Sequence, residues 1–235
     1  IIGVLPTPEA VKAFVADKSP DKRSKLVDEL IARPEFVRMW VMKWAELLQI
    51  RTQNNQFYYK NAVLYFEWLR EQFEQAQPMD KIVQELLGAR GGTFSNPAGN
   101  FYQVERDTLK LTENAAQIFM GMRIQCAQCH NHPFDVWKQK QFYELATYFG
   151  KTRRIENQFS RRVYTTEGKE TTVLWPPERK KPPVRNPVAP KFPFELEEFT
   201  SAPSHVKRFE AKRAKEALAA SGTDEGKSLS ALLDD

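Results

Sequence analysis

Apolar residues recur at helical spacing through most of the first 150 positions of the chain. In one stretch Phe36, Trp40 and Trp44 share a face with the leucines that follow, which is typical of an amphipathic helix whose tryptophans pack in the core. The pattern predicts seven helices, the first opened by Thr7-Pro8, the second by Ser19-Pro20, the third by Pro34, and the others over residues 58–75, 79–87, 107–122 and 138–149.

Local signals mark the starts of the first two helices. Thr7 and Ser19 each precede a proline and then an acid, so we expect each hydroxyl to cap a helix whose first residue is the proline. By contrast, residues 91–100 predict a surface loop that folds over a cofactor, because they are rich in glycine, asparagine and serine. The glycine spacing of this loop fits neither a phosphate-binding loop nor a dinucleotide fingerprint.

The character of the chain changes after residue 150. Seven of the 15 prolines fall within residues 176–193, and this composition favours extended backbone. Residues 162–174 resemble two strands around a turn at Gly168 and predict one short β-hairpin. We expect a helical domain over residues 1–150, a basic, proline-rich extended segment over 151–203, and a helix with a flexible tail over 204–235.

Composition and charge exclude some classes of protein. With 235 residues and 41% hydrophobic content the chain can bury a core, and it has no apolar run of the length needed to cross a bilayer. It begins at Ile1 with no signal peptide, so we expect a mature or truncated fragment. The net charge is +5, with many basic residues after position 150, but no recognition motif accompanies them and we expect no nucleic-acid partner.

The two cysteines of the chain, Cys126 and Cys129, are three residues apart, and His130 follows directly. This is the c-type haem attachment motif, in which each thiol adds to a haem vinyl group and the histidine binds the iron. One helical turn between the sulfurs matches the separation of the two vinyl groups. The motif predicts one covalently bound haem c, with His130 as the proximal metal ligand.

Two other kinds of site use cysteines at this spacing. Zinc could be held by the two thiolates together with further ligands, although a second pair of cysteines is missing. A thioredoxin-like redox site would need an open strand-to-helix context and no histidine after the motif. The further ligands that the sequence offers for zinc are His130, His132, Asp135 and His205.

Three segments also carry a resemblance to a known family: residues 3–8, residues 98–102 and the run 121–134 around the motif. In this order they resemble the cytochrome c-like domain of unknown function found in planctomycete-type secreted proteins, DUF1549. The resemblance covers roughly residues 1–150. It implies a secreted or periplasmic haem-containing module, often joined to other domains, and it implies no settled reaction.

Several side chains are candidates for contact with the haem. His132 is expected to be a structural histidine, since the chain would have to cross the haem edge in two steps for it to reach the opposite face of the iron. The distal ligand stays open. The candidate partners of the anionic propionates are Arg123, Arg106, Asn100 and Tyr102, and Trp137 is expected to pack beside the ring with its indole nitrogen toward a propionate.

Together these observations predict a mostly α-helical, multi-helix domain around a CxxCH haem site. We expect an exported, periplasmic c-type cytochrome module that passes single electrons to a redox partner protein or within a larger assembly, with the basic segment as its docking surface. Attachment of haem requires reduced thiols and exported haem, which places the protein outside the cytoplasmic membrane. The alternatives are a haem oxidoreductase or accessory subunit with an open distal site, and a structural module stapled by haem or zinc.

Overall fold

The structure, a computed structural model, describes residues 1–52, 58–159, 162–177 and 184–194. The chain divides into two compact units, Ile1–Pro193 and Phe194–Asp235, and nearly all of the described residues belong to the first. About half of the described residues are helical, and the remainder includes a few short strands. The helix expected over residues 204–220 lies outside the described residues.

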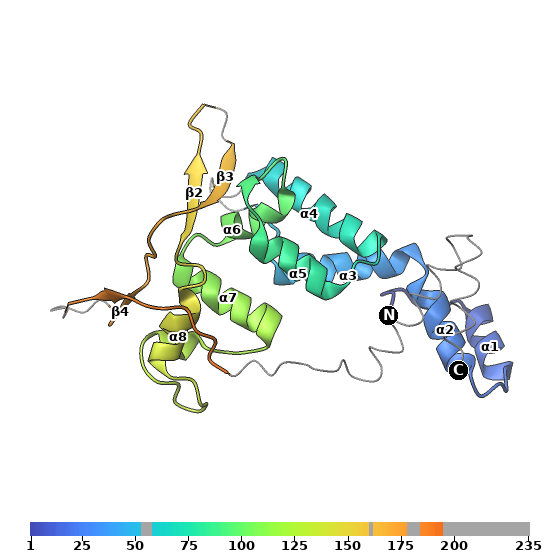
Figure 1. The fold of residues 1–235 in the computed structure, drawn as a ribbon. Helices are drawn as coiled ribbons and strands as arrows, with labels where there is room; N and C mark the ends of the chain where they lie inside the picture. The colour runs from blue at the N-terminus through green and yellow to red at the C-terminus, as the bar shows by residue number, and fades with distance from the viewer. Residues whose placement is uncertain (53–57, 160–161, 178–183, 195–235) are drawn as a thin grey trace, which may run out of the picture. The chain divides into compact units, whose positions relative to one another are not determined.

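The seven helices that the sequence predicts are all present, and a further short helix follows residue 100 (Figure 1). Predicted and observed ends agree within a few residues. The α-helices of the described residues are α1 (Pro8–Ala16), α2 (Lys22–Ile31), α3 (Pro34–Leu47), α4 (Tyr59–Glu74), α5 (Met79–Gly88), α6 (Phe101–Val104), α7 (Thr108–Met120) and α8 (Gln139–Ala146).

The two predicted N-terminal caps have different outcomes. Thr7 caps α1 as expected, because its hydroxyl accepts a hydrogen bond of 3.2 Å from the backbone N–H of Ala10. The prediction for Ser19 is wrong. The hydroxyl of Ser19 donates instead to the carboxylate of Asp17 at 2.6 Å, and α2 begins only at Lys22.

A first hydrophobic cluster holds α3, α4, α5 and α7 together. Its buried side chains include Leu69 of α4 and Val41 of α3. Some apolar residues that helical periodicity places on the same faces of these two helices are nevertheless exposed. Trp40 is 36% exposed and its indole N–H donates to the carbonyl of Ile1, while Val63 is 38% exposed. The buried stripe of α4 is rotated toward Tyr65, because the neighbouring surface is formed by α3 and by the loop after α5.

That loop was expected on the surface, and this holds for only part of it, because Gly91 and Ser95 are exposed whereas residues 98–100 are buried. It contains the strand β1 (Gly91–Gly92) and the 3-10 turn η1 (Pro97–Asn100), and its side chains Thr93 and Asn100 are fully buried. The amide of Asn61 in α4 donates to Thr93 Oγ1 and to Asn100 Oδ1, both at 2.8 Å. Asn100 in turn donates to the carbonyls of Thr93 and Pro97. When buried polar groups hydrogen-bond one another, they replace the hydrogen bonds that water would make to them, so the polar residues of a loop can be buried.

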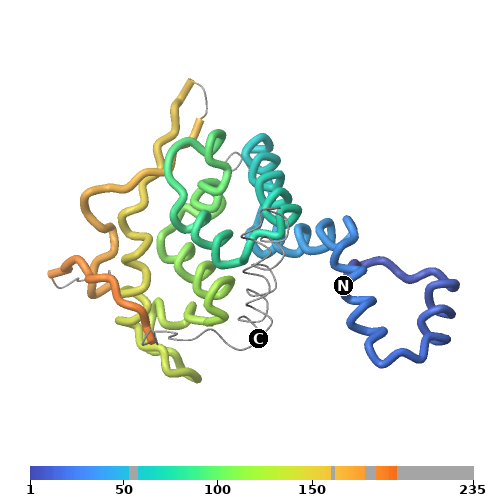
Figure 2. The backbone as a smooth tube through the Cα atoms, turned by 45° about the vertical axis from the view of Figure 1, so that its right-hand side comes forward, coloured from blue at the N-terminus to red at the C-terminus, as the bar shows by residue number. Residues whose placement is uncertain are grey.

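The strands form two small sheets. β3 (Val163–Glu167) is the centre of an antiparallel sheet, between β1 and β2 (Thr152–Glu156), with Thr165 opposite both Gly91 and Arg154. The second sheet pairs β4 (Leu174–Trp175) with β5 (Asn186–Pro187). In Figure 2 the orange segment that carries β4 passes beside α8, against which it packs.

The hairpin predicted over residues 162–174 is therefore wrong in its pairing. Residues 163–167 do form a strand, but its partners are β1 and β2, while residues 174–175 pair with β5. The physical reason lies at Gly168, whose N–H donates to the carbonyl of Lys151 at 2.7 Å and so continues the pairing toward β2 in place of a hairpin turn. A Cβ atom there would stand 2.8 Å from Nε of Arg153, so glycine leaves room for this side chain.

The buried network around Asn100 generates a prediction on stability. Replacing Asn100 by Ala removes one of the two acceptors of the Asn61 amide and the side-chain donor to two backbone carbonyls, and we expect the free energy of unfolding to fall by about 3 kcal/mol. Gln117→Ala, on the exposed face of α7, is the control and should change it by less than about 0.5 kcal/mol. Urea unfolding followed by circular dichroism measures both. Equal stabilities of the two variants would contradict the structural role of the network.

Candidate functional site

The CxxCH segment is delivered by the end of α7. Gly121 ends this helix in the left-handed conformation (φ 65°), which favours glycine, and the N–H of Met122 bonds back to the carbonyl of Ala116 at 3.0 Å. The chain then enters the 3-10 turn η2 (Gln125–Gln128). Ile124 and Ala127 are buried in a second hydrophobic cluster, which fixes this turn against α8. Helix α8 (Gln139–Ala146) contributes four side chains to that cluster, Phe142, Tyr143, Leu145 and Ala146.

Burial of Ala127 leaves the two cysteines on the outside of the turn. Cys126 and Cys129 are exposed free thiols. The N–H groups of Cys129 and His130 both approach the carbonyl of Cys126, at 3.3 and 3.4 Å. In a 3-10 turn the side chains of residues i and i+3 lie on the same side, so both thiols are presented to one face.

His130 is held by its own neighbour. Its Nδ1 lies 2.7 Å from the carbonyl oxygen of Asn131, and because a carbonyl can only accept, Nδ1 is the donor of this bond. Nε2 of the neutral ring then keeps its lone pair. Metal-binding histidines commonly donate their other ring N–H to a carbonyl in this way, which fixes the tautomer and the ring orientation.

Side chains of α8 anchor the backbone on either side of the histidine. The carbonyl of Gln128 accepts from the side-chain amide of Gln139 at 3.0 Å and from the Tyr143 hydroxyl at 3.3 Å. The backbone N–H of Gln139 donates to Asn131 Oδ1. Burial, and to a lesser extent the charge of Cys129, raises the pKa of Tyr143, so this phenol stays a donor at neutral pH.

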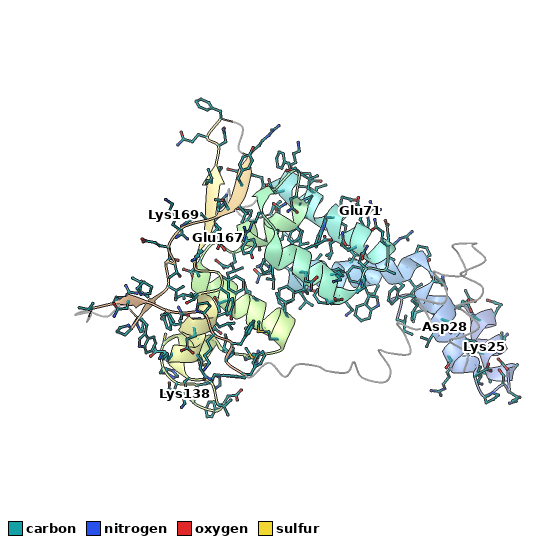
Figure 3. All side chains as sticks on the ribbon, in the orientation of Figure 1. Lys25, Asp28, Glu71, Lys138, Glu167 and Lys169 are labelled. Carbon is teal, nitrogen blue, oxygen red and sulfur yellow. The ribbon has the colours of Figure 1, made fainter. Side chains whose placement is uncertain are left out.

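The loop from His130 to α8 places two large apolar side chains in solvent. Phe134 is 95% exposed and Val136 is 74% exposed. The loop ends near Lys138, which is labelled in Figure 3 and precedes α8. Trp137 is half-buried against the second cluster, and its indole Nε1 is buried without a hydrogen-bond partner. His132 is held by its backbone, whose N–H donates to the carbonyl of Trp137 at 2.8 Å.

A cavity of about 710 Å³ opens beside the motif, between the start of α7, α8 and the segment around β4. Cys129 and Tyr143 line it on the side of the motif. Arg106, which precedes the cap residue of α7, and Arg185, directly before β5, line it as well. The volume lies within the range of small-molecule and cofactor sites.

The structure separates the candidate residues into two groups. Cys126, Cys129, His130 and Trp137 lie on one segment, with the exposed Arg123 shortly before it, and Arg106 reaches the cavity. Tyr102 and Asn100 are not brought to the motif. Tyr102 belongs to the first hydrophobic cluster, and its hydroxyl donates to the carbonyl of Leu87 at 2.6 Å. Asn100 is hydrogen-bonded within the loop of residues 91–100.

Tyr143 and Arg185 are the residues that sequence reasoning missed. Tyr143 stands four positions after Gln139, so the helical period of α8 places both on the side of the motif, and this signal was available. Arg185 carried no such signal. It reaches the cavity only because β5 pairs with β4, and short strands in a proline-rich segment give no readable register.

Two arginines of the basic segment have internal roles. Arg153 donates to the carbonyls of Gly150 and Glu170, at 3.0 and 2.6 Å, and Arg154 pairs with Glu156 at 3.2 Å. Both are half-buried. The two guanidinium groups therefore stabilise the sheet and its connection to α8 at least as much as they add charge to an exposed basic face.

The motif offers the groups that haem attachment takes, two exposed thiols followed by one histidine. Within the described residues, no group of three or more His, Cys, Asp or Glu side chains is placed to hold a metal ion, and the zinc-ligand candidate His205 lies outside them. Among the helices in the described part of the chain, none combines the length and apolar character that a membrane crossing requires.

Fold and site together define a domain that is about half helical and presents a CxxCH turn on its surface beside a large cavity. The chain belongs to the PSCyt2 family, described as protein of unknown function (DUF1549), whose model matches residues 1–154. The match confirms the resemblance as far as the DUF1549 family itself is concerned, and the cytochrome c-like character stays a prediction. Comparison with curated proteins gives no match, and comparison with solved structures gives none either.

The placement of Tyr102 generates a prediction on alkaline stability. Burial raises its pKa to about 12, whereas the phenol of an unfolded chain ionises near pH 10. Neutral Tyr102 therefore stabilises the fold fully below pH 10, and this contribution is lost as the pH rises toward 12. We expect the unfolding free energy of the wild type to fall by about 2 kcal/mol relative to Tyr102→Phe between pH 9 and 12.

Urea unfolding at a series of pH values measures this difference. Tyr59→Phe is the matched control, because Tyr59 is 76% exposed, and its profile should follow the wild type. If Tyr102→Phe also followed the wild type up to pH 12, the hydroxyl would not be buried as the structure places it.

Proposed function

We propose that the protein is an exported c-type cytochrome module that carries one haem on Cys126, Cys129 and His130 and transfers single electrons. The observation that carries this proposal is the state of the CxxCH turn. Both thiols are free and exposed, and Nδ1 of His130 is engaged by the Asn131 carbonyl, so that Nε2 is the nitrogen left for iron. A buried or disulfide-linked pair would not offer these atoms.

Each residue of the segment has a defined role in the proposal. The thiols of Cys126 and Cys129 form the two thioether bonds, and His130 provides the proximal nitrogen. Asn131 fixes the tautomer of His130, while Gln139 and Tyr143 hold the carbonyl of Gln128 in place. When bound, haem supplies a one-electron iron couple, and its potential is set by axial ligation and by burial.

Electron transfer to a partner protein is supported by the exposure of this segment. The cysteines and His130 lie at the surface, and Phe134 and Val136 expose apolar area directly after them. Weak redox encounters use small interfaces, below about 1,200 Å² in total. An apolar tip beside an exposed redox centre is suited to such a short contact, with Lys138 adding charge at its edge.

A haem oxidoreductase is the second candidate, and the cavity of about 710 Å³ beside Cys129 favours it. A small-molecule reaction would need an open distal position on the iron, whereas an electron carrier has two protein ligands. Binding of carbon monoxide to the reduced protein separates the two, because it requires an open or displaceable position. A stable six-coordinate spectrum that carbon monoxide does not alter supports the carrier.

The haem assignment is tested by expression in a bacterial periplasm together with a c-type haem maturation system. We expect the wild type to retain haem stain on a denaturing gel and to show a sharp reduced α band. Cys126→Ala with Cys129→Ala should lose the stain completely, and His130→Ala should lose the native spectrum. His132→Ala is the matched control and should keep both signals, since its ring makes no bond to iron in the proposal.

Colourless wild-type protein from cells that mature a known c-type cytochrome would contradict the proposal. Metal analysis of the same preparation then decides the remaining alternative. One zinc ion per chain, lost in the Cys126→Ala and Cys129→Ala variant, would establish a zinc staple in place of haem.

A further inference from the structure

We propose that a second, smaller cavity binds a small oxyanion that retains one O–H group, such as hydrogen carbonate or hydrogen phosphate. Arg154 of β2 donates a hydrogen bond to the ion, and Gln103 of α6 accepts one from it. The site uses none of the residues of the CxxCH motif, so this inference goes beyond the proposed function and does not depend on it.

The smaller cavity measures about 80 Å³ and is lined by residues of β2, β3 and α6 and of the start of α7. One buried water needs about 10–15 Å³, whereas sites for drug-sized ligands measure about 300–1,000 Å³. The volume therefore suits a ligand of a few non-hydrogen atoms.

Gln103 offers an acceptor to this cavity. The residue is 2% exposed, and its Nε2 donates to Thr165 Oγ1 at 2.9 Å. The Thr165 hydroxyl donates its own proton to the carbonyl of Gly99 at 3.5 Å, so it accepts from the amide, and this fixes which end of the amide is the oxygen. Gln103 Oε1 is left buried, with no partner among the described residues. An acceptor in this position needs a ligand that donates.

Arg154 offers a donor to the same cavity. Its Nη2 is bonded to Glu156 at 3.2 Å, but its Nε is buried and has no partner within the part of the chain that the structure describes. Arg154 stands directly opposite Thr165, and directly opposite side chains of an antiparallel pair lie on one face of the sheet. Because Gln103 is bonded to the same Thr165, the unpaired donor and the unpaired acceptor line one space.

The charge around the cavity favours an anion over a neutral ligand. The described residues that line it include three arginines and one acidic residue, Glu105. First burial and then the charge of Arg106 lower the pKa of Arg154, and the opposing effect of Glu156 is smaller than either. The guanidinium of Arg153 is bonded to backbone carbonyls, and Arg106 has a further partner in the chain. These two arginines therefore contribute charge, and no hydrogen bond to the ion is assigned to them.

A ligand for this site has to be small, carry negative charge and keep a proton on one oxygen. Its charged oxygen accepts from Arg154 Nε, and its O–H donates to Gln103 Oε1. Hydrogen carbonate and hydrogen phosphate meet all three conditions. Nitrate and sulfate have the corresponding planar and tetrahedral shapes without an O–H, so they would leave the Gln103 oxygen buried without a donor, which costs affinity. The O–H is therefore the feature that the site selects.

Isothermal titration calorimetry on the purified full chain tests this selectivity without any variant. Sodium hydrogen carbonate is compared with sodium nitrate at mildly alkaline pH, and sodium phosphate with sodium sulfate at neutral pH, at constant ionic strength. We expect at least one of the proton-bearing ions to bind about tenfold more tightly than its counterpart without an O–H, and the pair that shows this difference identifies the ion. Equal affinities within both pairs, or no binding of either proton-bearing ion, would overturn the inference.

Variants test the two residues separately. Arg154→Gln should weaken binding of the selected ion about tenfold, because it removes a charge-assisted hydrogen bond. Arg90→Gln is the matched control and should leave the affinity unchanged, since Arg90 also pairs with a glutamate but is exposed and does not line this cavity. Gln103→Met, which removes the amide oxygen, should bring the affinities of the two ions of the pair together.

Circular dichroism shows whether each variant is folded, and the selectivity of the wild type decides the question if either is not. Unchanged affinity in folded Arg154→Gln would place the ion elsewhere and overturn the inference. Unchanged selectivity in folded Gln103→Met would do the same, because the O–H of the ion would then have another partner.

Discussion

The packing of one short turn against one short helix is the constraint on which the site depends. Ile124, directly before η2, and Ala127 of η2 are buried against α8, and this contact determines that the cysteines at positions 126 and 129 face outward. The same helix supplies Gln139 and Tyr143, which bond to the carbonyl of Gln128. Apolar burial thus sets the orientation of the turn, and a few hydrogen bonds set its detail. Because Ala127 is completely buried, a larger side chain there would displace the whole motif.

The helices were readable from the sequence because their signals are local. Within the described residues, periodicity located every helix of eight residues or more, and the Thr7 cap is determined by neighbouring residues. The motif is equally local, so Cys126, Cys129 and His130 could be identified without a structure. Their exposure and the bond from His130 to Asn131 could not, because these depend on what Ala127 packs against.

What the sequence did not reveal depends on pairing between distant segments. β3 could be recognised as a strand, but its partners are the distant residues 91–92 on one side and residues 152–156 on the other, and no local pattern encodes that choice. The burial of residues 91–100 has the same origin, since the polar side chains of this loop are satisfied by Asn61 of α4. Arg185 belongs to this class as well, because it reaches the cavity through the pairing of β4 with β5.

The position of β3 in the middle of its sheet bears on where this domain ends. The family match stops at residue 154, which lies inside β2, whereas the strand that joins β1 to β2 begins at Val163. A protein cut at the family boundary would keep two edge strands with no centre, and their backbone N–H and C=O groups would be open to pairing with other chains. Residues 172–174, which wall the cavity, would be lost as well. The folding unit is therefore longer than the family model and reaches Pro193.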